Sequence, residues 1–283
     1  MNIKGKTAII TGATGKLAEA MVLALAEAGA NCVCIYHKNS AQAKKLERKI
    51  KSITGNVIAR SPDEIETMKQ SQLSLKKRDC FAPKGLAVTN SIFIQADLTK
   101  PKNIIKVFAH LKKFSTPQIL INAAAVFEKK TIKDISSKYI RQTFDINFTA
   151  SMIMSQKFVE IVRSGKKIKS RGKLVGKIIN ITDVIVQRPP AGFSIYSASK
   201  AALVAATKSL AKELAPDFTV NAVSPGIINW QKGTSAKLKK KILARILAGR
   251  TGSPQEIIQA VKFLIENDYI TGQIINIDGG ATV

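Results

Sequence analysis

Long apolar runs are missing from this sequence, and their absence excludes a membrane-spanning protein. No run free of Asp, Glu, Lys and Arg exceeds 14 residues, which is too short for a helix to span a bilayer. The first expected strand begins at Thr7, so we also expect no signal peptide. These features predict a soluble, cytoplasmic protein that does not associate with a membrane.

Cysteine and histidine are too scarce for a disulfide framework or a zinc site. The three cysteines cannot all pair, and Cys32 and Cys34 point to the same face of an expected strand, where we expect them to act as small apolar side chains. The two histidines stand in no zinc-binding spacing, so we expect no bound metal. This cysteine usage fits a reducing compartment.

Acidic residues are few: 19 Asp and Glu stand against 45 Lys and Arg, which gives a formal charge of +26. The excess is concentrated in Lys76–Arg78, Lys166–Lys177 and Lys232–Arg250. Nucleic-acid binding is disfavoured, because the basic segments lack interleaved aromatics and Lys outnumbers Arg 36 to 9. An acidic protein partner, such as an acyl carrier, and a solvated lysine surface without a specific role both stay open.

Apolar runs alternate regularly with amphipathic stretches along the chain. The expected strands are Thr7–Thr11, Asn31–Tyr36, Ser91–Gln95, Gln118–Asn122, Lys177–Ile181, Phe218–Ala222 and Gln273–Ile277. The expected helices are Lys16–Ala28, Ser40–Lys51 with Ser40 as N-cap, Lys102–Lys113, Asp134–Arg163, Ser194–Leu214 and Pro254–Asn267. This alternation predicts an α/β fold, a Rossmann-like doubly wound parallel sheet, in a single domain over residues 1–283.

Two stretches interrupt the alternation. Gly55–Thr89 mixes proline, acidic and basic patches, and we interpret it as an inserted loop or short helix. Asn229–Arg250 is irregular and basic, and we expect it to cover the substrate pocket.

Asp183, Tyr196 and Lys200 are the strongest candidates for catalysis. Tyr196 and Lys200 are one helical turn apart, so they project from the same face of the expected helix. An ammonium beside a phenol lowers the phenol pKa, which would make Tyr196 a proton donor near neutral pH. Asp183 follows an expected buried strand, and ligands of open α/β sheets bind at such strand ends.

A glycine-containing turn between the first strand and the first helix indicates a phosphate site. Thr11–Ala18 brings Gly12 and Gly15 to the helix start, where free N–H groups and the helix dipole attract anions. No acidic residue stands between Asn31 and Leu46 to bind the ribose 2′-hydroxyl of NADH. Lys38 and Ser40, with His37, would instead hold a 2′-phosphate, so the sequence favours NADPH.

Further motifs follow in chain order: Thr11-Gly12, Asp97-Leu98, Asn122-Ala123-Ala124-Ala125, Asn147, Tyr196 with Lys200, Pro225-Gly226, Thr271-Gly272 and Asp278-Gly279-Gly280. Together they resemble the short-chain dehydrogenase/reductase superfamily over nearly the whole chain apart from Gly55–Thr89. The resemblance implies the catalytic set Asn147, Asp183, Tyr196 and Lys200. It also implies these cofactor-binding residues: Gly12, Thr14, Lys16, Leu17, Tyr36, His37, Lys38, Asn39, Ser40, Asp97, Leu98, Asn122, Ala123, Tyr196, Lys200, Pro225, Gly226 and Ile227.

Departures from the superfamily pattern indicate a subgroup. Asp183 replaces the usual catalytic serine, and Lys16 and Ala18 replace two cofactor-loop glycines. Asp183, the basic Lys16, the run Tyr36-His37-Lys38 after the second strand and an aromatic residue at Phe127 are similar to pteridine reductases and dihydromonapterin reductases. That similarity implies a pterin stacked between Phe127 and the nicotinamide, in a substrate site of Phe127, Asp183 and Tyr196.

The resulting hypothesis is hydride transfer from NADPH to a pterin-like C=N bond. Tyr196 supplies the proton directly or through Asp183, Lys200 holds the nicotinamide ribose, and Asn147 orders a relay water. An ionised carboxylate at position 183 would oppose the alkoxide formed from a ketone, whereas it can accept from pterin N–H groups. The alternatives are a 3-oxoacyl-[acyl-carrier-protein] reductase or other carbonyl reductase, and a non-catalytic NADP-binding scaffold. The superfamily resemblance further implies a homotetramer formed through the long central helices.

Overall fold

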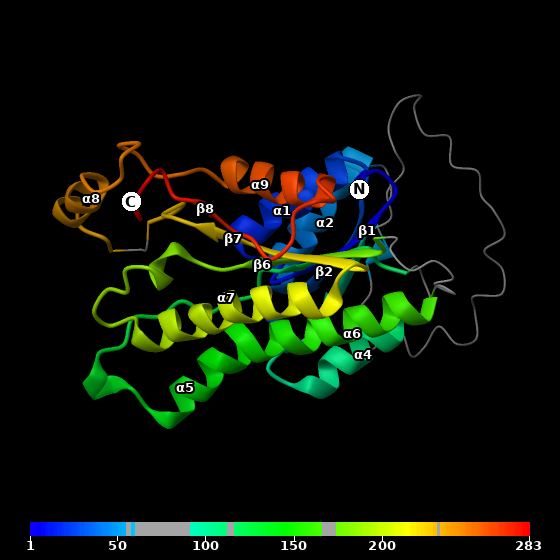
Figure 1. Ribbon diagram of the computed structural model, residues 1–283, viewed down its shortest axis with the longest axis horizontal. Coiled ribbons are helices and arrows are strands. Elements are labelled where there is room, and N and C mark those ends of the chain that lie inside the picture. Colours follow the sequence, from blue (N-terminus) through cyan, green and yellow to red (C-terminus); the bar gives the residue numbers. More distant parts are fainter. Residues whose placement is uncertain (55–57, 60–90, 112–115, 166–173, 231–232) are drawn as a thin grey trace.

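An eight-stranded parallel sheet runs through the middle of the molecule (Figure 1). The computed structural model describes residues 1–54, 58–59, 91–111, 116–165, 174–230 and 233–283. The strand order is β3-β4-β2-β1-β5-β6-β7-β8, so the chain winds outward from β1 in both directions and the predicted doubly wound α/β fold is confirmed. The strands are β1 Thr7–Thr11, β2 Asn31–Tyr36, β3 Ile58–Ala59, β4 Ile92–Gln95, β5 Ile119–Asn122, β6 Gly176–Ile181, β7 Phe218–Pro225 and β8 Ile274–Ile277.

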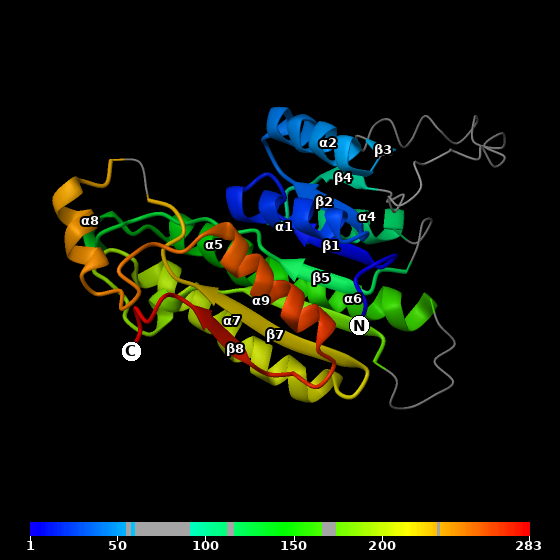
Figure 2. The ribbon, with the colours of Figure 1, turned by 90° about the horizontal axis from the view of Figure 1, so that it is seen from above.

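Helices cover both faces of the sheet (Figures 1 and 2). On one face lie α1 Lys16–Glu27, α2 Ser40–Thr54 and α9 Pro254–Glu266; on the other lie α4 Pro101–Leu111, α6 Ala150–Gly165 and α7 Ser194–Leu214. Two apolar clusters fill the spaces between the sheet and these layers. The central strands β1, β5 and β6 are buried over their whole length, and most of their residues are apolar because both faces of each strand are covered.

The first part of the expected insert is a strand rather than a loop or short helix. Ile58 and Ala59 form β3, which pairs in parallel with Ile92 and Phe93 of β4. Main-chain hydrogen bonding to an available sheet edge decides the structure of so short a segment, and a sequence pattern does not reveal that partner. The rest of the expected insert, residues 55–57 and 60–89, lies outside the described part of the chain, as does Cys80.

The expected helix over Asp134–Arg163 is divided into different helical types. A 3-10 turn at Ile132–Asp134 precedes α5 (Ser137–Phe144), and a π-helical turn at Asp145–Thr149 joins α5 to α6. The Ser136 hydroxyl caps α5 by accepting from the Tyr139 N–H. π turns of this kind commonly occur at functional sites, and this one contains Asn147.

The basic segment Asn229–Arg250 contains the short helix α8, Ala236–Leu243, which has no buried residue. Figure 2 shows the arrowheads of β7 and β8 pointing to the end of the molecule where α8 lies. Within the described residues, none of the helices is both long and apolar enough to cross a membrane. Cys32 and Cys34 are buried in the core as expected, and burial raises the pKa of the Cys32 thiol to about 12.

Candidate active site

Strand β6 and helix α7 bring three of the expected catalytic residues together at the carboxyl ends of the strands. Asp183 follows β6 two residues after its end, and Tyr196 and Lys200 lie in the first two turns of α7. The neighbouring strand β7 is joined to this point by the Thr182 N–H, which donates to the Val223 carbonyl at 2.9 Å. The site therefore forms where parallel strands end, as expected for an open α/β sheet.

The Tyr196 hydroxyl donates a hydrogen bond to Oδ2 of Asp183 at 2.7 Å. The other oxygen, Oδ1, accepts from the Ile185 N–H at 2.9 Å, so Asp183 also caps the 3-10 turn that follows β6. Burial raises the pKa of Asp183, and this effect outweighs its hydrogen bonds and the nearby Lys200 charge. The capping role and the contact with Tyr196 are thus compatible, and they hold the carboxyl group in one orientation.

The expected lowering of the Tyr196 pKa by Lys200 is wrong for this structure. Burial and the Asp183 carboxylate raise the pKa of Tyr196 well above its ordinary value. The Lys200 ammonium donates to the Ile181 carbonyl at 2.8 Å, and burial lowers its pKa to about 8. The one-turn spacing puts both side chains on one face of α7, but Asp183 is the charged group that affects the pKa of Tyr196 most.

Asn147 is fully buried, and its side chain joins three segments. Its Oδ1 accepts from the Val126 N–H at 2.8 Å, and its Nδ2 donates to the Val126 carbonyl at 3.1 Å and to the Ser199 hydroxyl at 3.0 Å. Ser199 in turn donates to the Tyr196 carbonyl at 2.7 Å. Both protons of the amide are therefore used within the protein, so its side chain positions the loop after β5 against α7.

The turn after β1 approaches the loop after β5 too closely for any side chain at Gly12. A Cβ there would lie 2.8 Å from Cα of Ala124, and Gly12 has φ +69°. The Thr11 hydroxyl joins the same two loops by accepting from the N–H groups of Ala123 and Ala124 at 2.9 and 3.0 Å. Sequence reasoning placed Thr11 in the cofactor loop but did not assign it this role.

The start of α1 has the features of an anion site. Gly15 is its N-cap and supplies no side-chain hydrogen bond, so the first N–H groups are not capped by a side chain. Thr14 is half-buried beside it, Lys16 is exposed, and Leu17 packs against the core. Ala18 is buried, so the methyl group that replaces a glycine fits into the core.

The end of β2 presents an exposed polar run opposite the end of β4. Tyr36 is half-buried, whereas the four residues His37, Lys38, Asn39 and Ser40 are exposed. His37 lies 3.9 Å from the Asp97 carboxylate, measured from Nε2 to Oδ2, and Leu98 is buried beneath. Asn39 rather than Ser40 caps α2, because its Oδ1 accepts from the Gln42 N–H at 3.1 Å.

Asn122 anchors the middle of this edge through buried amides. Its Nδ2 donates to Oδ1 of Asn180 at 2.8 Å, and Asn180 donates to the Thr207 hydroxyl at 2.9 Å. Ala123 follows in the loop that Thr11 holds. These bonds tie β5 and β6 to α7.

Pro225, the first residue of the expected nicotinamide loop, ends β7, and Gly226 and Ile227 follow it. A Cβ on Gly226 would lie 2.8 Å from Cα of Asp278, so the position requires glycine. The Gly226 N–H donates to the Ile277 carbonyl at 2.9 Å, and the Ile227 carbonyl accepts from the Gly252 N–H at 2.9 Å. The loop is thereby fixed to β8 and to the residues just before α9.

Three aromatic rings cluster at the site. Phe127 is about half exposed; its ring stacks on Phe193 with centroids 4.9 Å apart and meets Tyr196 edge to face at 4.6 Å. Phe193 was missed by sequence reasoning, although it is the N-cap residue of α7. The sequence offered one indication of its role, because Phe193 stands three residues before Tyr196.

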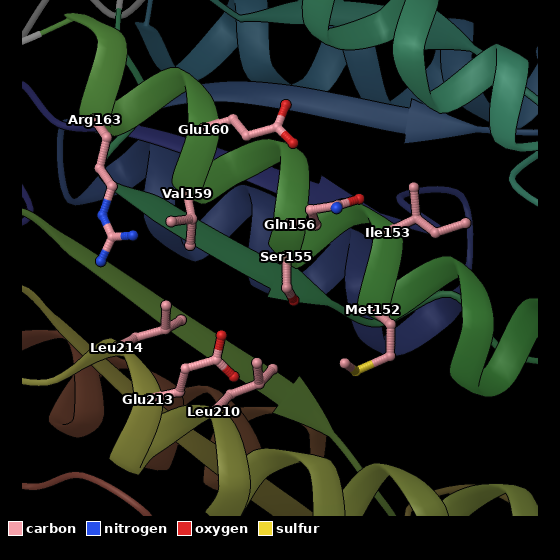
Figure 3. A pocket seen from close by; sticks show the side chains of 10 residues that line it. All are labelled: Met152, Ile153, Ser155, Gln156, Val159, Glu160, Arg163, Leu210, Glu213 and Leu214. Atoms are coloured by element: carbon pink, nitrogen blue, oxygen red, sulfur yellow. The ribbon is translucent and has the colours of Figure 1, made fainter.

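A separate groove of about 390 Å³ lies between α6 and α7, away from these residues (Figure 3). Met152, Ser155 and Arg163 line it from α6, and Leu210 and Leu214 line it from α7. None of the candidate catalytic or cofactor residues lines it. Among the described residues there is no cluster of His, Cys, Asp and Glu that could hold a metal ion.

Comparisons with known proteins agree with this geometry. The family model described as enoyl-(acyl carrier protein) reductase matches residues 75–282. A 3-oxoacyl-[acyl-carrier-protein] reductase of Buchnera aphidicola is 35% identical over 213 residues, which cover 73% of this chain and 84% of that protein. A dihydromonapterin reductase of Enterobacter is 27% identical over 216 residues, covering 76% of this chain and 87% of that protein. A short-chain dehydrogenase from Burkholderia cenocepacia, solved in complex with NADP, has a TM-score of 0.79 and 25% identity with full coverage of both chains.

Proposed function

Because the chain belongs to the short-chain dehydrogenase/reductase superfamily of oxidoreductases, we propose that it is an NADPH-dependent reductase of a pterin-like C=N bond. The observation that carries this proposal is the 2.7 Å hydrogen bond from Tyr196 to Asp183. It places a buried carboxyl group, rather than a serine hydroxyl, beside the tyrosine that gives the proton.

NADPH fits the residues at the carboxyl ends of the strands. Gly12 leaves the backbone bare beside the N-terminus of α1, where N–H groups without a side-chain cap favour a diphosphate. Lys38 and Ser40 are exposed at the end of β2, and the segment lacks an acidic residue that would repel a 2′-phosphate. When bound, NADPH supplies the hydride that adds to the carbon of the C=N bond, and the coenzyme is thereby oxidised to NADP+.

The proton that completes the reduction comes from the pair of Asp183 and Tyr196. Phenolate and carboxylate 2.7 Å apart cannot both be ionised at low cost, so Tyr196 gives up its proton readily only when Asp183 is neutral. Burial raises the pKa of Asp183 and thereby favours its neutral form. Tyr196 then protonates the imine nitrogen while Asp183 reprotonates Tyr196, and a C–N single bond with a new N–H results.

An imine suits this pair better than a ketone. A ketone oxygen becomes an alkoxide, which hydroxyl donors stabilise and a carboxylate destabilises. A reduced pterin ring instead offers N–H donors that the carboxylate can accept. Phe127, backed by the stacked ring of Phe193, supplies an apolar surface for a flat heterocycle.

Two alternatives are kept. Similarity to a 3-oxoacyl-[acyl-carrier-protein] reductase favours a carrier-bound ketone, and the excess of lysines would suit an acidic carrier. A non-catalytic NADP-binding scaffold is favoured by the altered glycine loop, but the hydrogen-bonded set of Asn147, Ser199, Tyr196 and Asp183 argues against it.

NADPH oxidation by the purified protein decides among these functions. Dihydrobiopterin, dihydromonapterin and dihydrofolate are tested beside an acetoacetyl thioester, with Tyr196→Phe as the control for catalysis. We expect turnover of at least one dihydropterin and its loss in the variant. Turnover of the thioester alone would replace the proposal by the first alternative, and NADPH binding without turnover on any substrate would favour the scaffold.

We also propose that the protein is a homotetramer assembled through α6 and α7. The groove between these helices combines apolar side chains with Arg163, Glu160 and Glu213, a mixture suited to a self-complementary contact. Light scattering after gel filtration tests the assembly, with Leu210→Glu expected to dissociate it.

A further inference from the structure

The segment between β7 and α9 leaves the sheet next to the catalytic strand. Its two ends are joined by the Gly252 N–H, which donates to the Ile227 carbonyl at 2.9 Å. The segment starts from β7, which lies beside β6, the strand that precedes Asp183. Ile181 of β6 is in register with Val223 of β7. Helix α8 therefore stands at the end of the molecule where the active site lies (Figure 1).

Three lysines of α8 form one surface, which we call the lysine face: Lys237, Lys240 and Lys241. They are spaced i, i+3 and i+4, so they project from one side of the helix, and all three are exposed. Within the described residues, no carboxylate lies within ion-pairing distance of them. Residues 229–250 contain neither Asp nor Glu, so the face has no acidic partner in its own segment.

Several other basic side chains among the described residues do have acidic partners. Lys49 pairs with Glu19 at 2.7 Å, Lys157 with Glu160 at 2.8 Å, and Arg250 with Glu256 at 2.7 Å. Like charges at i, i+3 and i+4 repel, and a cation in the first turn, such as Lys237, also opposes the helix dipole. The lysine face therefore carries three like charges without an acidic partner, and an anion bound to it would reduce their mutual repulsion.

We propose that the lysine face binds a polycarboxylate tail attached to the substrate ring. The inference rests on the proposed function, and it names the substrate class as a dihydropterin conjugated to one or more glutamates. The flat ring occupies the aromatic site at Phe127, and the flexible tail extends over α8. Lysine ammonium groups suit such a tail because they are mobile point charges that follow a chain of carboxylates without fixed geometry.

The molecule contains its own reporter of tail binding. Trp230 is the single tryptophan of the chain, and the Lys239 ammonium lies 5.8 Å from the centre of its ring. Lys239 lies between Lys237 and Lys240 in the chain. An anion bound to the lysine face should therefore change the electric field at the indole ring of Trp230. We expect Trp230 fluorescence to change when a polyglutamate conjugate binds.

The experiment compares dihydropteroate, dihydrofolate and dihydrofolyl-triglutamate, which share the ring and differ in the number of carboxylates. We expect kcat/KM to rise along the series by roughly tenfold at low ionic strength, and the rise to vanish at about 0.5 M salt, where screening is short-ranged. Lys240→Glu with Lys241→Glu should abolish the rise and leave dihydropteroate within roughly twofold of the unmodified protein.

Lys208→Glu with Lys212→Glu is the matched control. Both lysines are exposed on α7, about 12 and 18 Å farther along the helix than Lys200 at 1.5 Å per residue, and the change in charge is the same. This variant should keep the rise with tail length. Equal kcat/KM for all three substrates, or equal losses in both variants, would overturn the assignment of the lysine face.

Failure of the proposed function is distinguishable from failure of this inference. If neither these three substrates nor dihydrobiopterin and dihydromonapterin are reduced, the proposed function is refuted. The tail site is then decided by titrating Trp230 fluorescence with pteroyl-triglutamate. Saturable binding that the α8 variant weakens and the α7 variant preserves upholds the site, and binding that is absent or unaffected by both variants overturns it.

Discussion

The Tyr196 hydroxyl lies 2.7 Å from Oδ2 of Asp183; Tyr196 is buried and Asp183 is half-buried. Replacing Asp183 by Asn removes the charge of the carboxylate and keeps the shape of the side chain. In Asp183→Asn, the pKa of Tyr196 should fall towards its ordinary value, because a neutral amide no longer opposes the phenolate. Dihydropterin turnover should fall by roughly 100-fold, since the group that reprotonates Tyr196 is lost.

Ultraviolet titration of tyrosinate measures this shift, with the spectrum of Tyr196→Phe subtracted to isolate one of the four tyrosines. Asp183→Ser serves as the control for chemistry, because a hydroxyl there suits an alkoxide and should favour ketones over imines. An unaltered phenol titration in Asp183→Asn would show that the carboxylate does not govern Tyr196.

The Lys200 ammonium predicts an alkaline limit to activity. Burial lowers its pKa to about 8, so the side chain is charged below that pH and neutral above it. In the proposed mechanism the ammonium of Lys200 holds the nicotinamide ribose, and a neutral amine would hold it less firmly. The kcat/KM for NADPH, which reports the free enzyme, should therefore fall as pH rises through about 8.

The variant Lys200→Arg tests whether Lys200 causes this alkaline decline in kcat/KM, because a guanidinium does not titrate in this pH range. The residual activity of the variant should lack the decline near pH 8. Persistence of the same limb would assign it to another group.

Lys38 should set the coenzyme preference. Lys38→Asp places a carboxylate where the 2′-phosphate is expected, so the ratio of kcat/KM for NADPH to that for NADH should fall by roughly 10- to 100-fold. Lys45→Asp, on the exposed surface of α2, has the same change in charge and should leave the ratio within roughly twofold. Similar ratios in both variants would remove Lys38 from the coenzyme site.

The sequence was informative where structure depends on local periodicity. Buried parallel strands are continuous apolar runs, so β1 and β2 begin and end at the expected residues. Helix α7 also has its expected bounds, and the one-turn spacing of Tyr196 and Lys200 put both on its inner side. These features need no knowledge of distant partners.

Features that depend on contacts between distant segments could not be predicted in the same way. The π turn contains Asn147, whose partner Ser199 is 52 residues away, and β3 exists through its pairing with β4. The Lys200 ammonium was expected to act on Tyr196, but the Ile181 carbonyl 19 residues earlier in the chain accepts its hydrogen bond. The pKa of Tyr196 was expected to fall but is raised, because the phenol is buried and the Asp183 carboxylate lies beside it, and neither effect could be seen from the spacing of Tyr196 and Lys200.

Gly12 should be irreplaceable for two separable reasons. Its φ of +69° disfavours any side chain, and a Cβ would also collide with the Ala124 backbone at 2.8 Å. Gly5 has φ +75° but open space around it, so Gly5→Ala measures the backbone effect alone at about 1 kcal/mol. Gly12→Ala should lose at least about 2 kcal/mol in urea unfolding and weaken NADPH binding. Equal losses in the two variants would show that the loops can separate without penalty.

Two serines of α7 provide a test of how the site is held. The Ser199 hydroxyl accepts from Asn147 at 3.0 Å and donates to the Tyr196 carbonyl at 2.7 Å. The Ser197 hydroxyl is equally buried, yet within the described residues it has no hydrogen-bond partner. Ser199→Ala should therefore cost about 1–3 kcal/mol, because it leaves the buried Asn147 amide short of an acceptor, whereas Ser197→Ala should be neutral or stabilising.

Catalysis should separate the two serine variants further. Ser199 acts through Asn147 and the turn that carries Tyr196, so its loss should lower kcat several-fold and leave the KM for the substrate nearly unchanged. Ser199→Thr keeps the hydroxyl and should recover part of the loss, provided that the added methyl group is accommodated. If Ser197→Ala and Ser199→Ala lower kcat alike, the link from Asn147 through Ser199 to Tyr196 does not position the catalytic phenol, and close packing of α7 alone accounts for its placement.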